Sequence, residues 1–165
     1  HSFDIRERIS FYEKLCRSHG ALLFEDYEEV KGWMDWLMDT LDSMERPKCL
    51  CHIDANVDNF LFFEDGSVKL LDWEYAGMCD PVMDVSMCAI YSYYKEEDME
   101  RLFRLYLRRE PSEDELFALY ANAALGGFLW CLWAVYKSIL GDEFGEYTII
   151  MYRYAKKYYR KLRKL

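Results

Sequence analysis

Residues 51–77, CHIDANVDNFLFFEDGSVKLLDWEYAG, hold the side chains in this sequence that are best suited to chemistry. Lys69 is the only lysine or arginine in this stretch, which carries the carboxylates of Asp54, Asp58, Glu64, Asp65, Asp72 and Glu74. Carboxylate and amide oxygens are hard ligands, which are the ligands that Mg²⁺ prefers. The stretch therefore predicts a magnesium site. The simpler alternative is a solvated acidic loop beside an ordinary hairpin.

The apolar runs on either side of Asp65-Gly66 predict a β-hairpin, because an Asp-Gly pair is typical of two-residue turns. With this turn, Asn59 lies opposite Asp72. Directly opposed residues have Cα atoms about 4.5–5.5 Å apart and side chains on one face. We therefore expect an amide and a carboxylate to meet at the open end of the hairpin. Asp54 and His52 lie on the loop that leads into that end.

The order H-x-D-x-x-x-x-N, then a hairpin, then Asp is typical of kinase active sites. In that arrangement Asp54 accepts the proton of the attacking hydroxyl group. Asn59 and Asp72 hold Mg²⁺ on the phosphates of ATP. The spacing and the strand pairing are independent requirements, and the sequence meets both.

The rest of the chain is expected to be mostly helical. Helical periodicity, capping residues and the three prolines predict helices over about residues 3–19, 25–44, 80–94, 96–110, 112–140 and 143–163. Asp80 is the expected N-cap before Pro81, and Ser112 with Glu115 forms a capping box. The fold class predicted is mostly α (α+β), one domain over residues 1–165, in which a small β-hairpin carries the active site.

Composition limits the possible classes of function. Hydrophobic residues make up 52% of the chain, which argues against disorder. The net charge of −9 is unevenly distributed along the chain. Residues 153–165 carry seven basic residues and no acid, so the other 152 residues hold 14 bases against 30 acids. Such an acidic body is a poor partner for nucleic acid. The six cysteines form no CxxC pair, no signal peptide is visible, and no apolar run of about 20 residues suggests membrane insertion. A cytoplasmic protein is expected.

The segment CHIDANVDNFLFF…VKLLDWEYAGMCDPVMDVS resembles the catalytic core of the choline/ethanolamine kinases, within the aminoglycoside-phosphotransferase-like group. The form is most similar to the bacterial LicA-type choline kinases. The resemblance implies a protein-kinase-like C-terminal lobe in which Asp54 is the catalytic base, His52 braces the loop, and Asn59 and Asp72 bind magnesium. Asp84 would have a structural role at the start of its helix.

The resemblance also implies parts that this sequence does not contain. A kinase needs a glycine-rich loop and a strand lysine for the nucleotide, and neither occurs here. The N-terminal nucleotide-binding lobe is thus expected to be absent from this chain, which by itself would not turn over ATP. Some bacterial relatives are fused to a nucleotidyltransferase, which would be a possible partner.

Aromatic residues give the best indication of the acceptor. Trp130 and Trp133 share one helix face, and indoles attract quaternary ammonium groups by up to ~2 kcal/mol. Together with the resemblance, they predict a choline pocket, to which Tyr91, Tyr75 and Glu74 would contribute. On spacing alone, such a pair usually belongs to the core. The alternatives are an ethanolamine or aminoglycoside kinase, and a kinase-like module that binds without catalysis.

Overall fold

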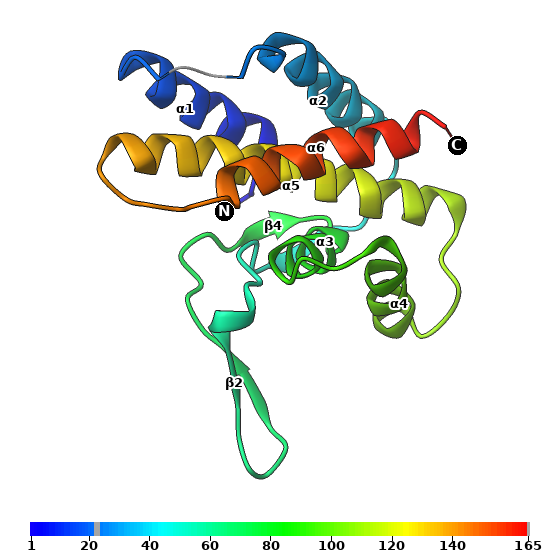
Figure 1. Ribbon diagram of the computed structural model, residues 1–165. Helices are drawn as coiled ribbons and strands as arrows, with labels where there is room; N and C mark the ends of the chain where they lie inside the picture. The colour runs from blue at the N-terminus through cyan, green and yellow to red at the C-terminus, as the bar shows by residue number, and fades with distance from the viewer. Residues whose placement is uncertain (22–23, 165) are drawn as a thin grey trace.

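The computed structural model describes residues 1–21 and 24–164, and these residues form a mostly helical fold, as predicted (Figure 1). The helices are α1 (Ile5–Ser18), α2 (Tyr27–Asp42), η1 (Val57–Asn59, a 3₁₀ turn), α3 (Val82–Tyr91), α4 (Glu96–Leu107), α5 (Glu113–Ile139) and α6 (Tyr147–Leu162). The strands are β1 (Cys49–Cys51), β2 (Phe60–Phe62), β3 (Val68–Leu70) and β4 (Gly77–Cys79).

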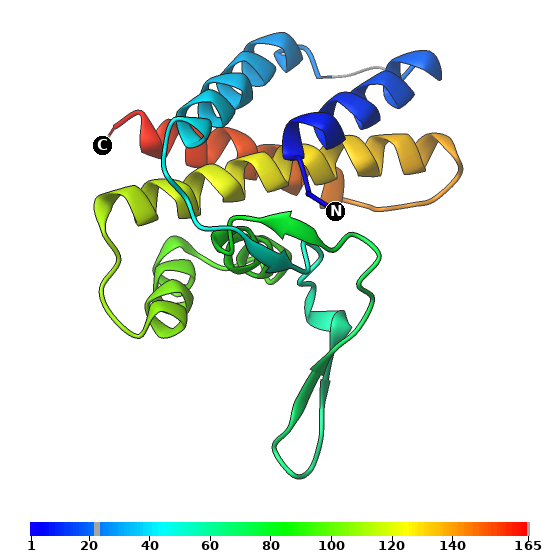
Figure 2. The same ribbon diagram turned by 180° about the vertical axis from the view of Figure 1, so that it is seen from behind.

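Helix α5 is the centre of the core. In Figure 1, α1 and α2 lie above it, α3, α4 and the strands lie below it, and α6 runs alongside; Figure 2 shows the same order from behind. Every residue from Ala118 to Leu132 is buried. The helix is long and apolar enough to cross a bilayer by length and composition, which the sequence analysis did not anticipate. However, 83% of its most apolar window is buried inside the fold, as in a core helix.

The start of α5 follows the predicted capping box, whereas α3 begins one residue later than predicted, with Pro81 as its N-cap. Ser112 Oγ accepts a hydrogen bond from Glu115 N, and the Glu115 carboxylate accepts one from Ser112 N, which completes the capping box that begins α5. The Asp80 carboxylate accepts a hydrogen bond from Val82 N at the start of α3 and also pairs with Arg46. Both starts were predictable because these contacts are local in sequence.

The hairpin prediction has the right strands but the wrong register. Phe60 pairs with Leu70, whereas the predicted turn would pair it with Leu71. The loop has three residues, 64–66, closed by a 3.0 Å hydrogen bond from Phe63 N to Ser67 O. Gly66 has a φ of 81°, which is typical of the three-residue loop that ends in a left-handed glycine. The Asp-Gly pair thus occupies the second and third positions of a longer loop.

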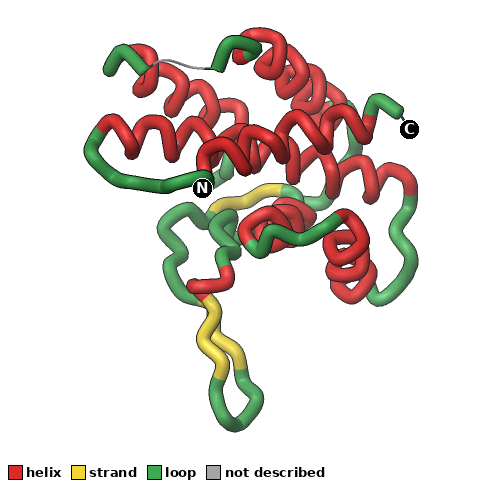
Figure 3. Tube along the Cα trace, viewed as in Figure 1, coloured by secondary structure: helices red, strands yellow, loops and turns green. Residues whose placement is uncertain are grey.

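The four strands form two separate two-stranded antiparallel sheets (Figure 3). Strands β1 and β4 pair below α5, with Cys49 opposite Cys79, while β2 and β3 form the hairpin that extends away from the helices in Figure 1. At the hairpin, Phe62 is 77% exposed. The loop between β1 and β2 therefore lies where the packed body meets the projecting hairpin.

The basic C-terminal helix faces acidic and aromatic partners of its own lobe. Lys156 forms an ion pair with Asp26, and Lys157 and Lys161 both pair with Glu96. Arg160 and Arg163 lie over the rings of Trp33 and Trp36, at 5.5 and 5.1 Å from the ring centroids. These two tryptophans pack against the core.

Candidate active site

The loop after β1 is held by one carboxylate from α3. Asp84 accepts a hydrogen bond from His52 N and another from Ile53 N, both at 2.8 Å. Ile53 has a φ of 72°, an unfavourable left-handed conformation for a β-branched residue. Such a conformation persists only where neighbouring contacts impose it. Asp84 thus fixes the backbone directly before Asp54, which agrees with the structural role expected for it.

His52 ties this loop to the end of the hairpin. Its side chain is buried, and Nε2 lies 2.6 Å from Leu71 O, so that Nε2–H donates to the carbonyl. The ring meets the edge of Trp73 at a centroid distance of 4.8 Å. His52 does not contact Asp54 in any of the described hydrogen bonds. The predicted bracing role therefore has a direct geometric basis.

Asn59 contacts Asp54 on the other side of the loop. Asn59 Nδ2 donates to Asp54 O at 2.9 Å and to Asp54 Oδ2 at 3.1 Å. Because the amide nitrogen is used in these bonds, Asn59 Oδ1 remains as an acceptor. The predicted opposition of Asn59 and Asp72 is wrong: Asn59 lies opposite Leu71, whose N–H donates to Asn59 O at 2.9 Å.

Asp72 follows directly after that last hairpin bond. It is exposed and has a φ of 59°, so the chain turns sharply there. Among the described residues, no group of three or more His, Cys, Asp and Glu side chains is poised to hold a metal ion. The donor set of one amide oxygen and one carboxylate still fits a magnesium ion that takes its remaining ligands from phosphates and water.

An aromatic cluster lies beside Asp54. Trp130 meets Tyr75 edge-to-face at a centroid distance of 5.3 Å, Tyr91 at 6.0 Å and Trp133 edge-to-face at 5.9 Å. All four residues were singled out in the sequence, and the fold brings them together. Trp130 itself is 3% exposed, and its indole N–H points to Met87 Sδ at 3.2 Å. It thus forms the back of the cluster and belongs to the core, whereas Trp133 is only half-buried.

Two tyrosines connect this cluster to Asp54. Burial raises the pKa of Tyr91 well above its usual range, and the charge of the nearby Asp54 carboxylate raises it further. Burial and the charge of Asp54 also raise the pKa of Tyr147. Both phenols therefore stay protonated at neutral pH.

The sequence analysis missed three of the residues around this cluster. Phe144 meets Trp133 at a centroid distance of 5.1 Å, and Tyr147 follows Phe144 at 6.2 Å. Tyr12 of α1 lies near the phenol of Tyr75, whose pKa burial raises to about 12. Their only signal in the sequence is that they are aromatic, in a chain with 14 tyrosines and 10 phenylalanines.

Glu74 is the predicted pocket residue that lies at the edge of the aromatic cluster. It is exposed, and its charge raises the pKa of both Tyr12 and Tyr75 after the larger effect of burial. The carboxylate therefore lies near the two phenols, where it adds negative charge at the edge of the aromatic cluster. A cationic ligand would be attracted by this charge and by Asp54.

The fold and this site define a class: a helical lobe whose catalytic loop and hairpin are arranged as in kinases. A comparison with family models agrees, because residues 5–119 match the phosphotransferase enzyme family. This match covers more than half of the chain, and the chain belongs to that family.

Two relatives are similar in sequence to this chain over most of its length. The chain is 27% identical to Protein LicA of Haemophilus influenzae over an alignment of 152 residues, which covers 88% of this chain and 41% of LicA. It is 26% identical to Ethanolamine kinase 1 of Mus musculus, over 74% of this chain and 42% of that protein. The chain thus spans less than half the length of the curated relatives that it matches.

Solved structures support the assignment. Choline kinase LicA from Streptococcus pneumoniae superposes with a TM-score of 0.83 and 28% identity, over 97% of this chain and 56% of that one. A structure of LicA in complex with AMP gives the same score and identity. A choline/ethanolamine kinase family protein from Mesorhizobium loti, at 24% identity, superposes with a TM-score of 0.85 over 95% of this chain and 55% of that one, which shows the shared fold. The predicted kinase-like lobe is confirmed.

Proposed function

We propose that this chain is the catalytic and acceptor-binding part of a kinase that transfers the γ-phosphoryl group of ATP to the hydroxyl group of choline. The observation that carries this proposal is the aromatic cluster around Trp130, of which Tyr91 lies close enough to Asp54 for the carboxylate to raise the pKa of its phenol. One end of this site suits a hydroxyl group and the other suits a quaternary ammonium group. Its relatives include a choline kinase and an ethanolamine kinase.

Each residue has a distinct role in this proposal. Asp54 accepts the proton of the attacking hydroxyl group and orients its oxygen toward the phosphorus atom. Asn59 holds the Asp54 carboxylate through Nδ2, while His52 and Asp84 hold the loop on either side. The loop is therefore set in position before the substrate arrives, which lowers the barrier by orientation.

Magnesium would neutralise phosphate charge in a site that is otherwise acidic. Asn59 Oδ1 and the Asp72 carboxylate are the residues that would hold it. ATP is the expected co-substrate, in line with the relative that is solved with AMP. We propose that the protein acts in the cytoplasm, where ATP is available. We expect it neither to bind nucleic acid nor to insert into a membrane. A nucleotidyltransferase, fused or separate, is the protein partner that we propose.

The trimethylammonium group would lie against Trp133, Tyr75 and Tyr91, with Trp130 behind them. Cation–π attraction favours such a wall when water is excluded. Ethanolamine carries a smaller ammonium group that seeks hydrogen-bond acceptors, and an aminoglycoside needs a larger pocket lined with carboxylates. The aromatic cluster therefore favours choline over both.

An ADP-release assay tests the proposal. The subject is a longer protein that carries this chain with a nucleotide-binding lobe, and the 165-residue chain is the inactive control. Choline, ethanolamine, an aminoglycoside and no acceptor are compared with Mg²⁺ present. Turnover with choline alone supports the proposal. Turnover with another acceptor overturns the choline pocket, and no turnover by a folded, ATP-binding protein favours a module that binds without catalysis.

A further inference from the structure

The outer face of α6 is basic and carries no acid. Helix α6 lies in front of α5 in Figure 1 and behind it in Figure 2, so this face points away from the core. Arg153, Lys157, Arg160 and Lys164 are exposed and follow each other at intervals of four, three and four residues. This spacing places them on one side of the helix, over a length of about 17 Å. Together with the exposed Arg163, they are called the α6 face below.

Most of the charge on the α6 face is not balanced by a carboxylate. Lys157 shares Glu96 with Lys161, which lies beside the face, and Lys156 pairs with Asp26. Within residues 1–21 and 24–164, no ion pair joins a carboxylate to the other bases of the face, which are Arg153, Arg160, Arg163 and Lys164. The face therefore carries an excess of positive charge, although the chain as a whole is acidic.

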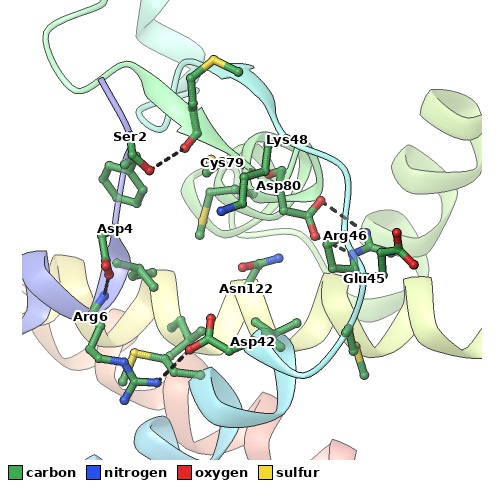
Figure 4. A pocket seen from close by; sticks show the side chains of 18 residues that line it. Ser2, Asp4, Arg6, Asp42, Glu45, Arg46, Lys48, Cys79, Asp80 and Asn122 are labelled. Carbon is green, nitrogen blue, oxygen red and sulfur yellow. Dashed lines mark hydrogen bonds and ion pairs between the residues drawn. The ribbon is translucent and has the colours of Figure 1, made fainter.

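The arginines on the opposite side of the helical body are held differently. Arg6 pairs with Asp42 and Arg46 pairs with Asp80, and all four residues line the cavity drawn in Figure 4. These guanidinium groups are used within the fold and attract no anion from outside. The unpaired bases of the α6 face have no such internal role.

A groove beside α6 adds a concave part to this surface. It has a volume of about 710 Å³ and lies between residues 24–26 and α6. Four bases of α6 line it, against the carboxylates of Glu25 and Asp26, of which Asp26 is already paired with Lys156. Phe24 and Ile149 add apolar surface, and Ile149 is 47% exposed. The groove therefore suits an anionic group that is attached to an apolar body.

The side chains around these bases favour one kind of anionic partner. Nucleic acids need exposed aromatic rings on which bases stack, but Tyr152, Tyr154 and Tyr158 of α6 are all buried in the core. Protein partners need a buried apolar centre, and the exposed residues of α6 itself include a single apolar one, Ile149, at one end. A membrane surface needs neither, because spread positive charge is enough to attract anionic lipids.

We propose that the α6 face docks on a membrane surface that contains anionic phospholipids, with lipid phosphates against Arg153, Arg160 and Lys164. Each base held close to such a surface strengthens binding about fivefold. The acidic remainder of the chain opposes docking only weakly, because charges more than about 8 Å from the lipid are screened at physiological ionic strength. The docking is peripheral, so α5 stays buried in the core, and it does not depend on the proposed kinase activity.

Co-sedimentation of the 165-residue chain with lipid vesicles tests the proposal. One set of vesicles contains phosphatidylcholine with about one third phosphatidylglycerol, and the other contains phosphatidylcholine alone. Free choline in both samples keeps the proposed acceptor pocket occupied. The chain should bind the anionic vesicles about tenfold more strongly, and this preference should disappear at about 1 M salt, where the Debye length is about 3 Å. Equal binding to both sets would overturn the proposal.

Paired variants test whether the α6 face is the part that docks. Arg153→Gln combined with Lys164→Gln removes two exposed bases of the face and should weaken binding to the anionic vesicles about 25-fold. Lys14→Gln combined with Lys69→Gln removes the same charge from two exposed lysines of α1 and the hairpin, and should change binding by less than about twofold. Equal weakening by both pairs would show that only net charge matters and would contradict the proposal.

Two soluble polyanions distinguish the other partners. Polyglutamate and duplex DNA are each offered to the chain at the same concentration of charge as the anionic lipid. Weaker binding of both than of the anionic vesicles supports docking on a membrane. Tighter binding of polyglutamate would overturn the proposal in favour of an acidic protein, and tighter binding of DNA would overturn it in favour of a nucleic acid.

Discussion

The loop that carries Asp54 and the contact between α5 and α6 are stabilised by different interactions. In the loop, the Ile53 side chain is buried in the core, and Asp84 fixes the backbone by accepting two backbone N–H groups at 2.8 Å. The α5–α6 contact depends on close packing, because a Cβ atom on Gly127 would lie 2.6 Å from Met151 O. One region is set by directed hydrogen bonds and the other by shape.

This difference matches what each region has to do. A reacting carboxylate must be fixed to within fractions of an ångström, and hydrogen bonds to charged groups give that direction. A helical core needs only complementary volume, which burial provides without direction. Substitutions in the two regions should therefore affect different measurements, and this expectation can be tested.

Asp84→Ala should have the largest effect. It leaves His52 N and Ile53 N without an acceptor, so the free energy of unfolding should fall by about 2–4 kcal/mol. The left-handed conformation of Ile53 should also relax, which would displace Asp54. Urea denaturation of the chain measures the stability. Asp58→Ala is the control: Asp58 is exposed on the same loop, and its variant should stay within about 0.5 kcal/mol. Equal stabilities of the two variants would refute the role of Asp84.

Gly127→Ala should be next, with a loss of about 2 kcal/mol, because the new methyl group meets the backbone of α6. Gly32→Ala is the matched control on α2, where a new Cβ has no neighbour within 4 Å. Alanine is the better helix former, so this variant should gain about 0.5–1 kcal/mol. Thermal unfolding gives both values. A gain in stability for Gly127→Ala, like that expected for Gly32→Ala, would show that packing between α5 and α6 is looser than described.

Glu115→Gln should have the smallest effect and a distinct pH dependence. The Arg109 guanidinium and Ser112 N–H lower the pKa of Glu115 to about 2, from a usual value of 4.5. The ionised carboxylate therefore stabilises the fold above about pH 4.5, and this contribution is lost as the pH falls toward 2. At pH 7 the variant should be about 1 kcal/mol less stable, because solvent screens the pair. A difference that persists unchanged at pH 2 would contradict this assignment.

The parts of the fold that were predicted correctly from the sequence depend on neighbours close in the chain. The capping box at Ser112 and the N-terminal signal at Asp80 mark helix starts because their hydrogen bonds span three residues or fewer. The order of His52, Asp54 and Asn59 likewise predicted this loop, because Asn59 and Asp54 are only five residues apart and are joined by a hydrogen bond.

The errors arise where structure depends on loop geometry or on distant residues. Asp65-Gly66 fits a two-residue turn and also the last two positions of a three-residue loop, and the choice shifts the pairing by one. Phe144 contacts the rings of Trp133 and Tyr147, which joins the start of α6 to α5. No local pattern distinguishes Phe144 and Tyr147 from aromatic residues that only pack in the core.

The central claim is that Asp54 is the general base for phosphoryl transfer and that a separate group of aromatic side chains binds the ammonium group. The most direct test is the steady-state kinetics of Asp54→Asn, in the longer protein with choline as acceptor. The account predicts a fall in kcat of about 10²–10⁴, the usual contribution of a general base. It also predicts little change in KM, because Trp133 and Tyr75 still hold the ammonium group. A variant that folds and retains kcat within about threefold would contradict the account.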